Sequence, residues 1–94
     1  SLITEGCEIF GRVSGSVLSA GVLVEEGAVV EDSVIMPYSQ IGRGAVIKRA
    51  IIAENVVVGE DAAIGGDTGD IAVVGSNTRV PKGHTLAAGQ QMGI

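Results

Sequence analysis

The stretch VLVEEGAVVEDSVIMPYSQIGRGAVIKRAIIAENVVVGEDAAIG, residues 22–65, repeats itself. A shift of 17 positions places Ser33-Val34-Ile35 on Ala50-Ile51-Ile52, and the same shift backwards places it on Ser16-Val17-Leu18. Self-similarity at a fixed short period is typical of repeat architectures, in which each unit packs on the next. The sequence therefore predicts a solenoid.

A shorter period lies inside each repeat. Aliphatic residues recur at steps of six or five positions, and a small residue such as Ala28 or Ala45 follows four positions later. The spacing of about 3.6 residues that an amphipathic helix needs does not fit. Short β-branched segments bounded by Gly, Asp and Asn indicate short strands joined by tight turns. The aliphatic positions form three expected ladders with one residue per coil: Val24, Ile41 and Val58; Val30, Ile47 and Ile64; and Leu18, Ile35 and Ile52.

This hexapeptide pattern predicts one all-β domain over residues 1–94, a single-stranded parallel β-helix of about five coils. Three strands form one triangular coil, and each aliphatic residue points inward beneath its equivalent in the next coil. Burial of each such side chain contributes roughly 1.5–3 kcal/mol, and the contribution needs a stacked neighbour. The six-residue period is similar to that of hexapeptide-repeat proteins, and this resemblance implies a left-handed helix.

The two ends of the repeat are less regular. Cys7, Ile9 and Val13 have slipped spacing, which predicts an imperfect first coil. The segment GGDTGD, residues 65–70, interrupts the register, and the register resumes at Val74. This segment occurs once and lacks a glycine that calcium-binding nonapeptide repeats require. We expect it to form a turn or a small loop at one corner.

Composition narrows the class of protein. The chain has 94 residues, a net charge of −5 and only two aromatic residues, so its core must consist of aliphatic side chains. The acidic balance argues against a nucleic-acid partner, which would require a basic face. No apolar segment approaches the roughly 18 residues that span a bilayer, so no membrane partner is expected. A single cysteine allows no internal disulfide and favours a cytoplasmic location.

Few residues are candidates for chemistry. His84 is the only histidine, so it could act as a general base in an acyltransferase or be an ordinary turn residue. A metal site made of three histidines is excluded by the count, and no metal site is expected. Cys7 lies between Glu5 and Glu8, which disfavour a thiolate, so we expect a small core or edge residue.

Two basic groups occur on this acidic chain. One contains Arg43, Lys48 and Arg49, and the other contains Arg79, Lys82 and His84. Either group could bind a phosphorylated metabolite through charge-assisted hydrogen bonds, or could be scattered charge on a solvated face. No nucleotide-binding glycine loop and no pair of carboxylates suited to catalysis is present. The sequence therefore indicates a scaffold without a self-contained active site.

Four segments in order carry a family resemblance: GSVLS at residues 15–19, DSVIM at 32–36, KRAIIAEN at 48–55, and VVG followed by VPKG at 73–83. With them, nearly the whole chain resembles the C-terminal domain of ADP-glucose pyrophosphorylase, or glucose-1-phosphate adenylyltransferase, and bacterial glycogen-synthesis members are the best match. Members of that family join ATP and glucose 1-phosphate to give ADP-glucose and pyrophosphate with Mg²⁺. The resemblance implies that the catalytic nucleotidyltransferase domain, which uses ATP and Mg²⁺, precedes the β-helix in a longer parent protein.

The resemblance implies no catalytic residue and no cofactor within this chain. It implies a domain that packs on its own catalytic domain, helps to form a homo- or hetero-tetramer and contributes to binding a phosphorylated effector. Plant-type members are expected to carry effector-contacting lysines at the positions of Glu54 and Gly75, where this chain departs from the pattern. The basic candidates for effector binding are Lys48, Arg49, Arg79 and Lys82. A stand-alone hexapeptide acyltransferase and a non-catalytic assembly module are the alternatives.

Overall fold

The computed structural model describes all 94 residues and contains strands and turns without any helix. Sheet A consists of β1 (Leu2–Ile3), β4 (Val17–Leu18), β7 (Val34–Ile35), β10 (Ala50–Ile52), β13 (Ala72–Val74) and β16 (Gln91–Met92). Sheet B consists of β2 (Glu8–Ile9), β5 (Leu23–Val24), β8 (Gln40–Ile41), β11 (Val57–Val58) and β14 (Arg79–Val80). Sheet C consists of β3 (Arg12–Ser14), β6 (Val29–Glu31), β9 (Val46–Lys48), β12 (Ala63–Gly65) and β15 (Thr85–Leu86).

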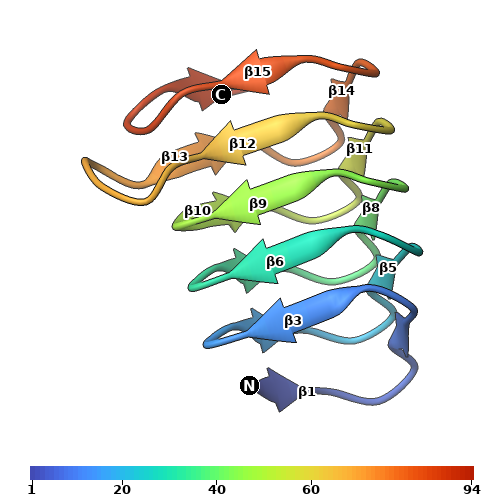
Figure 1. Cartoon of the computed structure of the whole chain (residues 1–94). Helices are drawn as coiled ribbons and strands as arrows, with labels where there is room; N and C mark the ends of the chain where they lie inside the picture. Colours follow the sequence, from blue (N-terminus) through green and yellow to red (C-terminus); the bar gives the residue numbers. More distant parts are fainter.

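The three sheets are the sides of a triangular solenoid about five coils tall. All strand pairs are parallel, and each strand pairs with the strand three elements later. In Figure 1 the chain climbs from the N-terminus to the C-terminus while the front strands run to the left and the chain returns to the right behind them. This sense of rotation is left-handed, so the predicted left-handed parallel β-helix is confirmed. The structure contains no helix that is long and apolar enough to cross a membrane.

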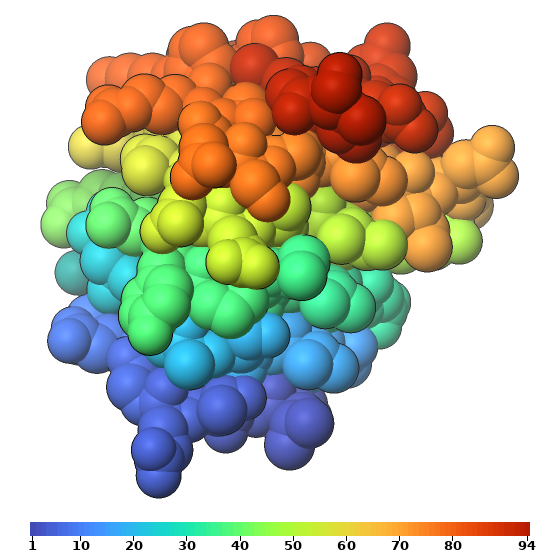
Figure 2. Space-filling model, turned by 180° about the vertical axis from the view of Figure 1, so that it is seen from behind, coloured from blue at the N-terminus to red at the C-terminus, as the bar shows by residue number.

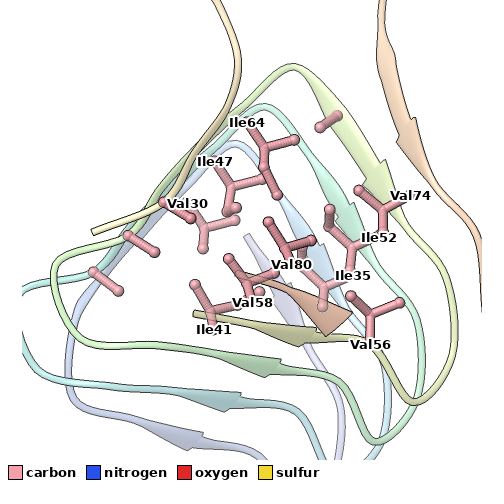
Figure 3. Packing of buried hydrophobic residues seen from close by; sticks show 14 of the residues in the cluster. Val30, Ile35, Ile41, Ile47, Ile52, Val56, Val58, Ile64, Val74 and Val80 are labelled. Carbon is pink, nitrogen blue, oxygen red and sulfur yellow. The ribbon is translucent and has the colours of Figure 1, made fainter. Parts of the chain in front are cut away.

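The core is a narrow column of aliphatic side chains. The ladder positions are buried and lie in register, as Ile41 does between Val24 and Val58 in sheet B. Figure 3 shows the three ladders converging on the axis from three sides, with Ile47 in one, Val58 in the next and Ile52 in the third. Side chains alternate between the two faces of a strand, so the residues flanking each ladder position point outward.

The corners turn sharply because one residue at each adopts a left-handed backbone conformation. At the corner between sheets C and A this residue is Gly15, Asp32 or Arg49, with φ of 56°, 48° and 46°. Asp and Asn tolerate this conformation better than most residues, which explains the polar residues between the strands. The non-glycine residues with positive φ are Asp32, Tyr38, Arg49, Asn55, Asp61 and Asn77.

Both expected irregularities are present. Strands of the regular coils pair at a shift of 17 residues, as Val34 does with Ile51. In the first coil the shift is only 15 residues, since Leu2 of β1 pairs with Val17 of β4. In the fifth coil Ala50 pairs with Ala72, so this coil is five residues longer than its neighbours. The extra residues form the loop between β12 and β13 that projects from one corner in Figures 1 and 2. We call residues 66–70 the Asp67 loop.

Candidate functional site

The interior of the β-helix offers no place for chemistry. Its 19 buried hydrophobic residues form one cluster, and the only buried polar side chains are Ser16, Ser33 and Ser39. Every buried side-chain nitrogen or oxygen atom has a hydrogen-bond partner. A functional site must therefore lie on the outer surface.

The three buried serines connect adjacent coils. The Ser33 hydroxyl donates to the carbonyl oxygen of Glu31 at 2.7 Å and accepts from the backbone N–H of Ala50 at 3.1 Å. Ser16 bonds in the same way one coil lower, and its hydroxyl accepts from the N–H of Ser33 at 3.0 Å. These hydroxyls satisfy backbone groups that would otherwise be buried without a partner, so the serines are structural.

The four basic residues expected to bind an effector lie at different corners. Lys48 ends β9 and Arg49 follows it, at the corner between sheets C and A. Arg79 begins β14 in sheet B, and Lys82 lies at the corner between sheets B and C. The structure brings Lys48 and Arg49 together but does not join them with Arg79 and Lys82, so the four residues do not form one site.

Lys48 and Arg49 contact the Asp67 loop. The ammonium group of Lys48 donates to Oδ1 of Asp67 at 3.1 Å, and Nη1 of Arg49 donates to the carbonyl oxygen of Gly69 at 2.7 Å. The hydrogen bond that Lys48 donates to Asp67, followed by the charge of that carboxylate, raises the pKa of Lys48. The Asp67 carboxylate therefore stabilises the charged form of Lys48.

A shallow groove crosses the outer face of sheet C beside this corner. It has a volume of about 370 Å³, and β3, β6 and β9 line it. Val29 and Val46 contribute apolar surface, and Arg12, Glu31 and Lys48 add charge. The groove was not predicted from the sequence. A signal for it was present, since its outward-facing residues directly precede or follow the ladder positions Val30 and Ile47.

His84 and Cys7 lie in ordinary structural surroundings. His84 lies between β14 and β15, and its backbone N–H donates to the carbonyl oxygen of Pro81 at 3.1 Å. Cys7 packs against the core, and its thiol donates to the carbonyl oxygen of Ser19 at 3.0 Å. No three His, Cys, Asp or Glu side chains gather where they could hold a metal ion. Gly75 has no room for a side chain, because a Cβ atom there would clash with the carbonyl oxygen of Gly93.

Comparison with known proteins identifies the family. The protein-family model named GlmU-like, C-terminal hexapeptide matches residues 1–73 of the chain. The chain belongs to this family. A search of curated proteins finds no match. As a GlmU-like hexapeptide domain, the chain is of the type associated with acyltransferases and nucleotidyltransferases.

The outer face of sheet A is the most apolar surface of this hexapeptide domain. Leu2, Val17, Val34, Ile51 and Val73 lie in register as one outward column across five coils. Val17 and Val34 are 38% and 39% exposed. The outward positions after the inner ladder on the middle coils are Ser19, Met36, Ala53 and Gly75, so the face carries no charge. This uncharged aliphatic column makes the outer face of sheet A a candidate docking face.

Proposed function

We propose that this hexapeptide domain assembles and regulates an ADP-glucose pyrophosphorylase. The GlmU-like family match supports a transferase-associated domain, and the ordered segments that end in VPKG support this particular transferase. In the proposed parent protein ATP and Mg²⁺ bind to the nucleotidyltransferase domain. Among the side chains of this chain, no three His, Cys, Asp or Glu residues gather as metal ligands, so the proposal assigns Mg²⁺ to the other domain.

The observation that carries the proposal is the aliphatic column on sheet A. Val17, Val34 and Ile51 present their side chains outward although the interior of the β-helix is complete without them. A column of this kind gains free energy only when another surface covers it, at about 25 cal/mol per Å² of apolar area removed from water. The proposed partners are the catalytic domain of the same polypeptide and neighbouring subunits of a homo- or hetero-tetramer, within a cytoplasmic enzyme.

The regulatory part of the proposal concerns the basic corner. Lys48 and Arg49 are adjacent cations beside a groove, an arrangement that suits a phosphorylated effector. Arg79 and Lys82 remain candidates for a second, separate contact. The effector then acts through the contact between the β-helix and the catalytic domain.

The test uses the native gene product, whose intact mass is measured first by mass spectrometry. A mass several times 9.4 kDa is expected. The purified protein is then assayed for ADP-glucose formation from ATP and glucose 1-phosphate, with and without sugar phosphates. Absence of ADP-glucose under all these conditions would refute the proposed enzyme.

The docking face is tested by a charge substitution in the same protein. Val34→Lys should lower the tetramer fraction in sedimentation experiments, because it places a charge in the covered column. Gln40→Lys is the matched control, since Gln40 is exposed on sheet B. The docking role is wrong if both variants assemble like the wild type, or if Gln40→Lys dissociates the tetramer as much as Val34→Lys does.

The GlmU-like family match over residues 1–73 also favours a second candidate, acyl transfer. His84, which lies beyond the matched residues, would be its general base. This candidate is tested by an assay for transfer of an acetyl group from acetyl-CoA to a hydroxyl or amine. The transfer activity should be lost in the His84→Ala variant. His84 is half-buried in a turn between two strands. The aliphatic column supports the assembly role, because covering it would remove apolar surface from water.

A further inference from the structure

The Asp67 loop is the one place where the chain leaves the β-helix. It departs at Gly65, which pairs with Lys48 in the coil below and has φ of 80°. A side chain at Gly65 would clash with the carbonyl oxygen of Lys48, so the loop must leave through a glycine. Residues 67–70 are exposed to solvent. The loop therefore gains little from burial and depends on a few polar contacts for its position.

Those contacts come from the two adjacent cations of the coil below. Asp67 offers a carboxylate oxygen to the ammonium group of Lys48, and Gly69 offers its carbonyl oxygen to the guanidinium group of Arg49. The loop thus presents two oxygen acceptors to two cations, as a phosphate group would. The side chain of Asp67 is 79% exposed and that of Lys48 is 31% exposed. A solute can reach this pair from solvent.

Lys48 has a second role, because it also lines the groove on sheet C together with Arg12, Glu31 and Val46. Its ammonium group therefore stands where the groove meets the loop. An anion that enters the groove and pairs with Lys48 competes with the Asp67 carboxylate for the same ammonium group. Glu31, in register with Lys48 one coil below, does not hold the loop and remains in place.

We propose that Asp67 and the carbonyl group of Gly69 act as an internal substitute for a phosphate group, and that a phosphomonoester which binds Lys48 and Arg49 displaces the Asp67 loop. The proposal rests on the proposed effector role of this corner and states how the site is regulated. Displacement frees an exposed segment at the corner between sheets C and A, next to the aliphatic face of sheet A. Binding of a small anion at Lys48 thereby changes the surface presented beside the docking face.

The size of the effect follows from the nature of the contact. An exposed ion pair shifts an equilibrium by at most about fivefold. Removal of the Asp67 carboxylate should therefore tighten phosphate binding by about two- to fivefold. A phosphate group outcompetes the carboxylate because it carries a charge of about −1.5 to −2 at pH 7 and three acceptor oxygens.

The experiment is a titration of the isotope-labelled 94-residue chain with inorganic phosphate, followed by two-dimensional NMR at constant ionic strength with chloride as the balancing anion. Asp67→Asn is compared with Asp70→Asn, which removes the same charge from the same loop without touching Lys48. We expect saturable shifts of the amides of residues 66–70 in the wild type. We expect tighter binding in Asp67→Asn, a smaller change in Asp70→Asn and no saturable binding in Lys48→Gln.

The outcomes separate the loop mechanism from the anion site. If Asp67→Asn and Asp70→Asn tighten binding equally, the effect is one of overall charge and the loop mechanism is wrong, while the anion site stands. If phosphate binds without shifting the loop amides, the loop is not displaced and the mechanism is again wrong. If neither the wild type nor Asp67→Asn binds phosphate, the anion site itself is wrong, although the assembly role and the ADP-glucose assay are unaffected.

Discussion

The ladder at Ile41 allows a quantitative test of the fold. Ile41 lies in the third coil of sheet B, between Val24 and Val58, and its side chain is fully buried. Ile41→Ala removes about three buried carbon groups, which at roughly 0.8 kcal/mol each amount to about 2.4 kcal/mol of lost transfer free energy. The cavity left between the neighbouring coils adds to this, so we expect a total loss within about 2–5 kcal/mol.

Such a loss is a large share of the stability of a domain, which is about 5–15 kcal/mol. The assay is urea unfolding followed by far-ultraviolet circular dichroism, with the free energy of unfolding obtained by linear extrapolation. Gln40→Ala is the matched control, because Gln40 is the exposed neighbour of Ile41 in the same strand. Its effect should stay within about 0.5 kcal/mol.

The slope of the urea transition carries further information. Each coil contacts only its neighbours, so a weakened central coil can let the two ends unfold separately. A lower slope for Ile41→Ala with two resolved transitions would show this uncoupling. Equal losses for Ile41→Ala and Gln40→Ala would refute the inward and outward alternation on which the ladder rests. Ile41→Asp, which buries an unpaired charge, should leave the chain unfolded.

Two further substitutions test the corners. Gly65→Ala should destabilise the chain by at least about 1–2 kcal/mol in the same urea assay, because Gly65 has φ of 80° and lies against the backbone of the coil below, whereas Gly66→Ala should have little effect. Comparable losses at both glycines would count against the close approach at Gly65. Ser33→Ala should cost about 1–3 kcal/mol, because the buried N–H of Ala50 loses its acceptor. A melting temperature equal to that of the exposed control Ser76→Ala would show that Ser33 is dispensable.

The coils were predictable because their signal is local. The inward positions recur at five or six residues, and Ile35 and Ile52 lie in the structure at the register that the 17-residue shift implies. The interruption at residues 65–70 was also expected as a loop, since glycine and aspartate replace the repeating aliphatic residues. The resemblance to hexapeptide proteins implied the left-handed sense, because the period alone is compatible with either hand.

The candidate site was harder to predict because it depends on residues that face outward. The sequence placed Lys48 and Arg49 in one basic group and Arg79 and Lys82 in another, and it offered all four as effector contacts without telling which corners they occupy. The structure places Lys48 and Arg49 at a different corner from Lys82, with Arg79 in sheet B. It also shows that Lys48 already forms an ion pair with Asp67. It also collects Val17 and Val34 into a column that no linear segment contains.

The sequence by itself determined which residues form the interior of this protein, because aliphatic residues that recur every five or six positions are buried when the strands stack into coils, each beside its partner one coil away. The tertiary structure alone decided the outside. Outward neighbours are set by the register between coils, and the five additional residues of the fifth coil carry Asp67 back over Lys48, a residue 19 positions earlier. Contacts of this kind arise from the geometry of stacking and leave no period in the sequence.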